Sequence, residues 1–158
     1  MRVFLATLNP TIGDLEGSTR LMRALVDDAR TQRADLVVFP ELAVSGYPPR
    51  DLLTHGGFVE ACADAARRLG ETGTQGITAV FGCPLAVDGV NPKAGIANAL
   101  VVYRDNRLLE TYHKRLLPTY DVFDEDRYFE PGSRAVVIDV AASSGTHTVG
   151  LTICEDLW

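Results

Sequence analysis

Concentrated positive charge is scarce in this sequence, where Lys and Arg form no run longer than a pair, as at Arg67-Arg68 and Lys114-Arg115. The formal net charge is -6. Because nucleic acids and anionic membranes are bound mainly through dense patches of Lys and Arg, neither is expected as the main partner. A small-molecule ligand is the better expectation.

Cysteine is also rare. Cys62, Cys83 and Cys154 stand at wide spacings, without a CxxC motif. A disulfide framework or a zinc site would need cysteines paired with each other or with histidines at short spacing. The sequence therefore predicts free thiols and no metal site.

Long hydrophobic runs are missing as well. The apolar segment at the N-terminus stops at Asn9-Pro10, which makes it too short for a signal peptide or a membrane span. We therefore expect a first β-strand at residues 2–8, and a cytoplasmic protein without a membrane partner.

What the sequence does contain is an apolar fraction of 46% over 158 residues, enough for the core of one globular domain. Helical periodicity predicts helices at 19–32, with Ser18 as the cap, and at 58–69, ending in the stretch 70–76. Strands alternate with these helices at first and form hairpins later, which predicts an α/β layer with a mixed sheet. Strands are expected at 2–8, 34–42, 77–85, in a hairpin over 97–114, at 134–140 and at 147–154.

The end of the chain differs from that of a complete α/β layer. The run 147–154 is expected to be a buried strand, and a covering helix normally follows a parallel strand. Only Glu155-Asp156-Leu157-Trp158 remain, which would form the first turn of that helix. We therefore expect a domain truncated after this strand, and self-association of the isolated chain through its uncovered sheet.

Glu41 is the first candidate functional residue. It follows the buried-strand run DLVVFP, so its carboxylate is expected at the carboxyl end of an inner strand, where open α/β sheets place their ligand crevice. A partly desolvated carboxylate there is a usable general base. A solvated acid at a strand end is an equally open alternative.

Lys114 is the second candidate. It closes the strand LLETYHK, where period-two alternation places it on the face of Tyr112 and turns His113 the other way. A lysine beside a cleft can donate to an oxyanion and favour a nearby thiolate, although a lysine in water remains open. A pair of His113 with Cys154 is disfavoured by the same alternation, and no orienting Asn or Asp is evident.

Cys154 is the third candidate. It ends the run HTVGLTIC and precedes a predicted helix start, an arrangement similar to a nucleophile elbow. A helix N-terminus would stabilise the thiolate, and backbone N–H groups would form part of an oxyanion hole. A small apolar core residue is the alternative, and it is the expected state of Cys62 and Cys83.

Together these residues resemble a known family. Glu41 in FPELAVSGYPPRDLL, Lys114 in HKRLLPTYDVFDEDRYFEPG and Cys154 in GLTICEDLW look like the Glu–Lys–Cys triad of the nitrilase (carbon–nitrogen hydrolase) superfamily. With NPTIGDLEGS near the start, nearly the whole chain is similar to the glutaminase domain of glutamine-dependent NAD synthetases. The resemblance implies an αββα sandwich of mixed β-sheets, of which residues 1–158 would be the N-terminal part.

The resemblance also implies a reaction. Cys154 would attack the side-chain carbonyl of glutamine, Glu41 would carry the proton from the thiol to the leaving ammonia, and Lys114 would support the oxyanion. Water would then hydrolyse a γ-glutamyl thioester. Hydrolysis of any amide needs a strong nucleophile, a proton shuttle and oxyanion stabilisation, because the amide carbon is a weak electrophile and its nitrogen a poor leaving group.

Three further residues take roles only through the resemblance. Glu125 matches an additional glutamate that would orient Lys114 or the attacking water, and otherwise is one more exposed acid. Tyr120 and Phe123 look like aromatics that line the glutamine pocket, and as sequence alone they could equally be core anchors.

The parts of a synthetase that bind nucleotides have no counterpart here. The chain contains neither an SGGxDS-type loop nor GxxxxGK[ST]. ATP, Mg and deamido-NAD would therefore act at a synthetase domain elsewhere in the same parent chain, and the glutaminase step itself needs no cofactor. A homo-oligomer is also expected from the resemblance.

Three hypotheses remain distinct at this point. The chain is the N-terminal part of an NAD synthetase, or a stand-alone amidase or nitrilase of the same superfamily, or a truncated module without catalysis. The segments GYPPRDLL and VFDEDRYF weigh against the second. The third stays open, because active sites tolerate misplacement of only about 0.5 Å.

Overall fold

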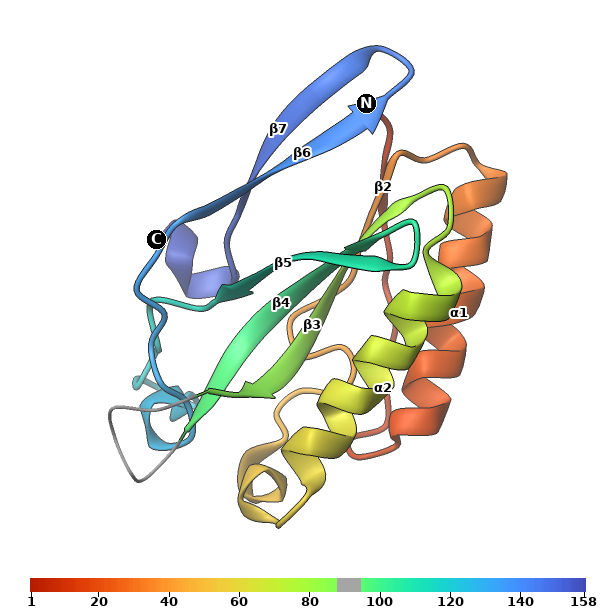
Figure 1. Cartoon of the computed structure of the whole chain (residues 1–158). Coiled ribbons are helices and arrows are strands. Elements are labelled where there is room, and N and C mark those ends of the chain that lie inside the picture. The colour runs from red at the N-terminus through yellow and green to blue at the C-terminus, as the bar shows by residue number, and fades with distance from the viewer. Residues whose placement is uncertain (88–94) are drawn as a thin grey trace.

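The computed structural model describes residues 1–87 and 95–158, in which two helices and a β-hairpin cover opposite faces of a five-stranded sheet (Figure 1). This arrangement confirms the predicted α/β class with a mixed sheet. In chain order the helices and strands are β1 (Val3–Leu5), α1 (Leu15–Thr31), β2 (Leu36–Val38), α2 (Phe58–Gly73), β3 (Thr78–Ala86), β4 (Ile96–Arg104), β5 (Arg107–His113), β6 (Val136–Ala142) and β7 (Gly145–Leu151).

The main sheet has the strand order β1-β2-β3-β4-β5. The first three strands run parallel, whereas β4 and β5 pair antiparallel, so the sheet is mixed as the sequence predicts. The hairpin β6–β7 forms a separate two-stranded sheet. Because β4 runs opposite to β3, its beginning lies beside the end of β3, at the same edge where β2 and β5 end.

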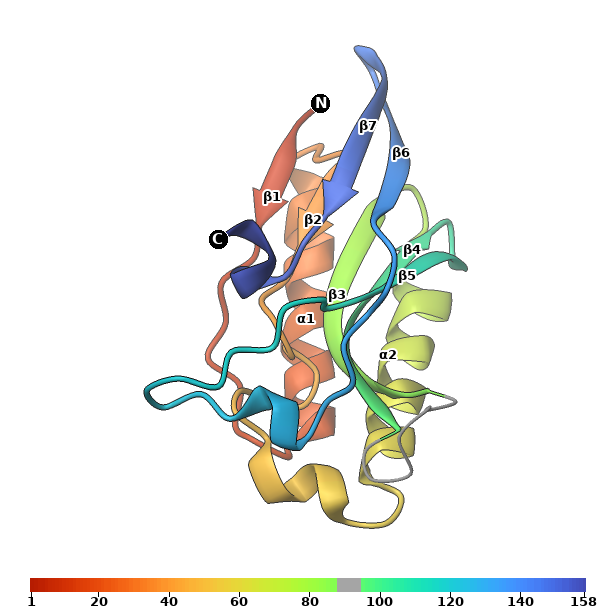
Figure 2. The ribbon, with the colours of Figure 1, turned by 90° about the vertical axis from the view of Figure 1, so that its left-hand side faces the viewer.

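The two faces of the main sheet belong to two different cores. On β3, Ala79 and Phe81 face the helices and pack in one cluster with Met22 of α1. Their neighbour Val80 faces the opposite way and packs with Ile138 of the hairpin. Figure 2 shows the hairpin standing in front of the sheet and the helices behind it. The period-two alternation of a strand thus builds both layers at once.

The first helix differs from its predicted limits, whereas the second ends within the predicted stretch 70–76. The α1 helix begins at Leu15, and Asp14 is its cap, because the Asp14 side chain accepts a hydrogen bond of 2.8 Å from the backbone N–H of Gly17. The predicted cap Ser18 is instead buried within the helix. The α2 helix continues past Gly70 to Gly73, since packing against the sheet outweighs the low helix propensity of glycine.

The prediction of a buried strand at 147–154 is wrong in two respects. The β7 strand ends at Leu151 and pairs only with β6. It is covered on one face, because Val149 and Leu151 pack towards the main sheet while the alternate residues Thr148 and Gly150 are exposed. The four residues after Ile153 form a short 3-10 helix, η3 (Cys154–Leu157).

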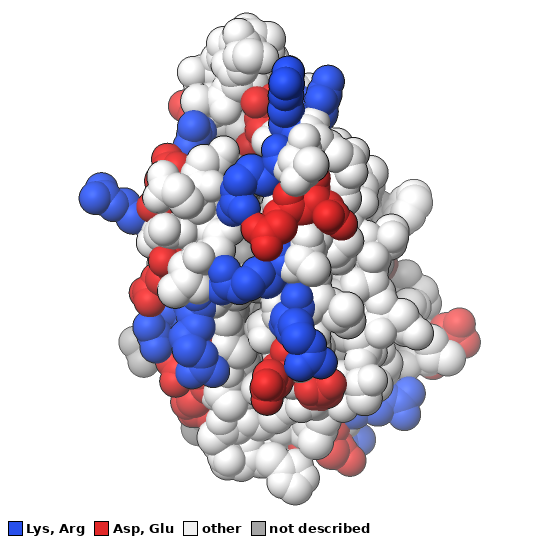
Figure 3. Space-filling view, turned by 90° about the vertical axis from the view of Figure 1, so that its right-hand side faces the viewer, with Lys and Arg blue, Asp and Glu red and all other residues white. Residues whose placement is uncertain are grey.

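The outer face of the helices carries interspersed charges of both signs (Figure 3). Arg30 pairs with Asp27 on α1, and Arg67 pairs with Glu71 on α2. Such pairs are typical of a solvated helix face. Within the described ranges, no helix combines the length and the apolar character that a membrane crossing requires.

Candidate active site

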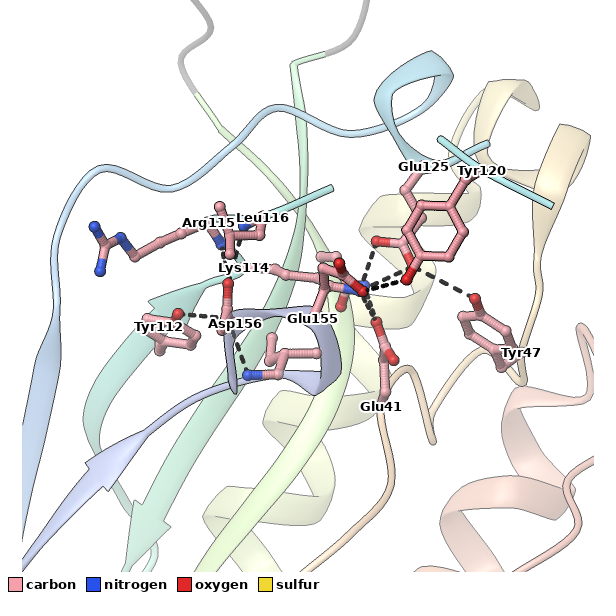
Figure 4. Close-up of polar contacts among 12 residues, drawn as sticks. Glu41, Tyr47, Tyr112, Lys114, Arg115, Leu116, Tyr120, Glu125, Glu155 and Asp156 are labelled. Atoms are coloured by element: carbon pink, nitrogen blue, oxygen red, sulfur yellow. Dashed lines mark hydrogen bonds and ion pairs between the residues drawn. The ribbon is translucent and has the colours of Figure 1, made fainter. Parts of the chain in front are cut away.

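The candidate residues come together at the sheet edge where β2 and β5 end. Glu41 follows β2, and Lys114 directly follows β5. The backbone N–H of Lys114 donates to the carbonyl of Asn98 at 2.8 Å. Asn98 itself lies near the start of β4, opposite Pro84 of β3. The sheet pairing therefore brings Asn98 close to the segments that carry Glu41 and Lys114. Figure 4 shows the side chains of Glu41, Lys114 and Glu125 pointing toward one another.

Lys114 is the centre of this cluster and is completely buried. Its Nζ lies 2.7 Å from Oε1 of Glu41 and 2.9 and 2.8 Å from the two carboxylate oxygens of Glu125. The three contacts match the three N–H donors of an ammonium group. The alternative of a terminal lysine in water is wrong, and so is that of Glu125 as an exposed acid, since Glu125 is buried as well.

The charges of this cluster depend on one another. Burial alone would lower the pKa of Lys114, but its hydrogen bonds to Glu125 and Glu41 outweigh burial and raise it, so the ammonium stays charged. Burial raises the pKa of Glu125, and the charge of Glu41 adds to this effect while Lys114 opposes it. One cation thus holds two carboxylates in a poorly hydrated place.

Glu41 has its two carboxylate oxygens in different surroundings. Oε1 accepts hydrogen bonds from Lys114 Nζ at 2.7 Å and from Asn98 Nδ2 at 2.6 Å. For Oε2, the described residues supply no hydrogen bond. The carboxylate is therefore anchored through one oxygen, and the other is available to accept a proton.

Two glycines allow the backbone to come this close. A Cβ on Gly82 would lie 2.3 Å from the carbonyl oxygen of Pro40, directly before Glu41. A Cβ on Gly132 would lie 2.2 Å from the carbonyl oxygen of His113, and the backbone N–H of Gly132 donates to the carbonyl of Lys114 at 2.7 Å. Both glycines make room for the segments that carry the charged side chains.

Cys154 begins η3 with a positive φ of 44°, a conformation that L-residues rarely adopt. Its side chain is exposed, whereas Cys62 and Cys83 are buried in the helix-side core, as the sequence predicts. A non-glycine residue held in this strained conformation between strand and helix is the hallmark of a nucleophile elbow. The alternative of Cys154 as a core residue is therefore wrong.

The expected stabilisation of a thiolate is not found. Burial raises the pKa of the Cys154 thiol, and the negative charges of Glu41, Glu125 and Glu155 add to the effect of burial, while Lys114 only partly opposes it. The thiol is therefore protonated near neutral pH. Cys154 therefore lies close enough to Glu41, Lys114 and Glu125 for their charges to act on its thiol.

Tyr120 and Phe123 lie on the loop between Lys114 and Glu125. Tyr120 is 56% exposed, and its hydroxyl donates to Glu155 Oε2 at 2.8 Å, next to Cys154. The two rings meet edge to face, with centroids 5.7 Å apart. Neither residue belongs to a hydrophobic core cluster, so both side chains can contact a ligand at the surface of the site.

A cavity of about 560 Å³ adjoins the cluster. Glu125 and Phe123 form part of its wall, together with Tyr47, whose hydroxyl lies 3.4 Å from Glu125 Oε1. Burial raises the pKa of Tyr47, and the charges of Glu125 and Glu41 raise it further, so Tyr47 remains a neutral donor. Cys154 lies outside this cavity wall.

His113 is separated from this site, as alternation predicts. It lines another small cavity with Gly132 and Arg134. Burial lowers its pKa, and the charge of Arg134 lowers it further. In the part of the chain that the structure describes, no group of three or more His, Cys, Asp or Glu side chains is placed to hold a metal ion.

Sequence reasoning missed Asn98, Tyr47 and Asp156. Asn98 is fully buried inside an apolar strand, where a polar residue needs a partner, and this was the available signal. Tyr47 carries no such signal. The Asp156 carboxylate accepts four hydrogen bonds. The sequence signal for Asp156 was its position two residues after Cys154 in CEDLW.

The chain is similar to longer enzymes over its whole length. It is 38% identical to the glutamine-dependent NAD(+) synthetase of Thermotoga maritima over 159 residues, which span all of this chain and 26% of that protein. It is 40% identical to the enzyme of that name from Xanthomonas campestris pv. campestris over 161 residues, or 27% of that protein. The chain thus spans about a quarter of the length of these relatives.

Solved structures show the same fold. Glutamine-dependent NAD+ synthetase from Acinetobacter baumannii in complex with ADP matches with a TM-score of 0.87 and 35% identity, over 99% of this chain and 28% of that one. An amidase from Nesterenkonia sp. matches with a TM-score of 0.78 and 23% identity, over 99% of this chain and 56% of that one. At that identity the amidase supports the fold alone.

The family assignment rests on a match that covers nearly the whole chain. The carbon–nitrogen hydrolase family covers residues 2–158 and therefore includes every strand of both sheets and all residues of the Glu–Lys–Glu cluster and the Cys154 turn. The chain belongs to the carbon–nitrogen hydrolase family.

Proposed function

We propose that this domain hydrolyses the side-chain amide of glutamine and supplies the ammonia to the synthetase part of a longer chain, where deamido-NAD is amidated with ATP and Mg. The observation that carries the proposal is the exposed Cys154 on its strained turn, beside the buried cluster of Glu41, Lys114 and Glu125. The similarity to NAD synthetases over the whole chain supports glutamine as substrate.

The raised pKa of Cys154 makes a base necessary in the first step. Oε2 of Glu41 accepts the thiol proton while sulfur attacks the amide carbon of glutamine. The tetrahedral oxyanion then receives a hydrogen bond from Lys114 and from backbone N–H groups at the start of η3. For this, Lys114 gives up one of its two contacts with Glu125, because all three of its donors are otherwise occupied.

The second half of the reaction reverses the proton movement. Glu41 returns the proton to the leaving nitrogen, the C–N bond breaks, and ammonia departs from a γ-glutamyl thioester. A water molecule then attacks the thioester, Glu41 takes its proton, and the S–C bond breaks to give glutamate and the thiol. Glu125 keeps Lys114 in place throughout, and Tyr120 and Phe123 contact the substrate at the surface of the site.

Ammonia release from glutamine by the full-length protein tests the proposal. Cys154→Ala should abolish release, whereas Cys62→Ala, which removes a buried thiol of the helix-side core, should retain it. Unchanged release in Cys154→Ala would eliminate the proposed nucleophile. Release from simple amides but not from glutamine would favour a stand-alone amidase, and no release from either would favour a module without catalysis.

A further inference from the structure

We propose that Asp156 is a positioning residue that ties the Cys154 turn to the strand end carrying Lys114. The proposal rests on the proposed function only where it concerns turnover, since the structural tie exists in the resting protein. Asp156 itself lies outside the Glu–Lys–Glu cluster and has no part in the reaction described above.

The carboxylate of Asp156 uses both oxygens, each for two hydrogen bonds. Oδ1 accepts from the backbone N–H groups of Arg115 at 3.0 Å and Leu116 at 2.9 Å. Oδ2 accepts from the hydroxyl of Tyr112 at 2.6 Å and from the backbone N–H of Ile153 at 3.0 Å. One side chain thus joins residues of the Cys154 turn to residues on both sides of Lys114 (Figure 4).

The bonds to Ile153 close the turn itself. Ile153 donates its N–H to the Asp156 carboxylate, and the N–H of Asp156 donates to the carbonyl of Ile153 at 3.0 Å. Cys154 and Glu155 are the two residues enclosed between these bonds. The strained φ of Cys154 is therefore held from both ends of the turn.

The bonds to Arg115 and Leu116 set the distance between two catalytic side chains. Lys114 cannot shift on its own side, because its backbone is paired with Asn98 and its ammonium with two buried carboxylates. The residues that follow it bind Asp156 directly. Any movement of the Cys154 turn relative to Lys114 must consequently break hydrogen bonds of Asp156.

Asp156 is suited to this task at neutral pH. Burial would raise its pKa, but the hydrogen bonds from Tyr112, Ile153, Leu116 and Arg115 outweigh burial and lower it. Asp156 is therefore ionised, and hydrogen bonds to an ionised acceptor are roughly twice as strong as neutral ones. An asparagine at this position would have the same size, but its NH2 group would face N–H donors where the carboxylate accepts.

The test compares three variants of the full-length protein. Asp156→Asn removes about half of the acceptor capacity, and Tyr112→Phe removes one donor while it leaves the charge in place. Asp139→Asn is the matched control, since this exposed carboxylate on β6 accepts a single bond from Thr148 at 2.7 Å. The readouts are hydrogen exchange of the Arg115 and Leu116 amides, the pH profile of alkylation of Cys154 by iodoacetamide, and glutaminase kinetics.

In Asp156→Asn we expect the two amides to exchange at least tenfold faster and the alkylation midpoint to shift, because the Cys154 turn is no longer held at a fixed distance from the charges of Glu41, Lys114 and Glu125. We also expect kcat to fall at least tenfold with KM changed less than threefold. Tyr112→Phe should move each value in the same direction by less, and it replaces Asp156→Asn if that variant does not fold. Asp139→Asn should match the wild type.

An alkylation midpoint and a kcat like those of the wild type in Asp156→Asn would overturn the proposal. If the wild type does not hydrolyse glutamine but the exchange rates and the midpoint still shift in Asp156→Asn, the proposed function fails while the positioning role stands. If the wild type hydrolyses glutamine and neither the exchange rates nor the alkylation midpoint shifts in Asp156→Asn, the positioning role fails alone.

Discussion

Removing the buried cation at position 114 should destabilise the domain strongly. In Lys114→Met, three contacts of 2.7 to 2.9 Å are lost, and the carboxylates of Glu41 and Glu125 remain side by side with no cation between them. Loss of one partner from a buried ion pair costs about 3–5 kcal/mol. This corresponds to a roughly 100- to 4,000-fold change in the unfolding equilibrium constant.

The loss should depend on pH in a defined direction. Lys114 is the largest influence that lowers the pKa of Glu125, so in the variant burial and the charge of Glu41 raise this pKa further. A carboxyl whose pKa is higher in the folded than in the unfolded state adds stability below the unfolded pKa, and this stability disappears as the pH rises through the folded pKa. The deficit of Lys114→Met should therefore shrink as the pH falls from 8 towards about 5.

Denaturant-dependent hydrogen exchange of the β4 and β5 amides measures this free energy within the full-length protein. The double variant Lys114→Met/Glu125→Gln is the control, because it also removes one of the stranded carboxylates and should recover about 1–3 kcal/mol. A single variant within about 1 kcal/mol of the wild type at pH 7 would refute the buried-cation argument.

Three further predictions concern the surroundings of the cluster. Gly82→Ala should lower the free energy of unfolding by about 1–3 kcal/mol and remove most of the glutaminase activity, because its Cβ would collide with Pro40. Gly150→Ala on β7 has open space around its Cβ and should leave the melting temperature unchanged. Equal melting temperatures of the two variants would contradict this. Asn98→Leu, which removes a donor to the proposed base, should lower kcat at least tenfold, and an unchanged kcat would show that Lys114 alone orients this base. Tyr120→Phe removes one exposed hydrogen bond, so the free energy of unfolding should change by less than about 1 kcal/mol. The KM for glutamine should rise, and an unchanged KM would place Tyr120 outside the substrate site.

The sequence predicted the placement of Glu41 and Lys114 because both depend on local patterns. A buried run ends just before Glu41, and alternation along β5 separates Lys114 from His113. These patterns place a side chain at a strand end and on one face. They do not show which neighbours it meets, because that depends on strand pairing.

The cluster around Lys114 could not be predicted for this reason. Asn98 reaches Glu41 only because β4 pairs with β3 in one particular register, and Glu125 reaches Lys114 through an irregular loop. The expected lowering of the Cys154 pKa was wrong for a similar reason. The sequence showed one nearby cation, whereas burial and three nearby carboxylates act in the opposite direction.

The errors in the fold have equally local causes. The Asp14 cap was missed because Ser18 also fits the pattern of a cap, and only the approach of the Gly17 backbone to Asp14 distinguishes them. The β7 strand was taken for a buried strand because its exposed positions are Thr and Gly rather than charged residues. In both cases a weakly polar side chain gave an ambiguous signal.

The central claim is that Cys154 forms a thioester with the glutamyl group. Acid quenching of the full-length protein during turnover of glutamine, followed by mass spectrometry of the peptide that contains Cys154, tests it most directly. We predict one glutamyl group on this peptide in the wild type and none in Cys154→Ala, which should also release no ammonia. Turnover of glutamine by Cys154→Ala at the wild-type rate, without a glutamyl group on the peptide, would contradict the account.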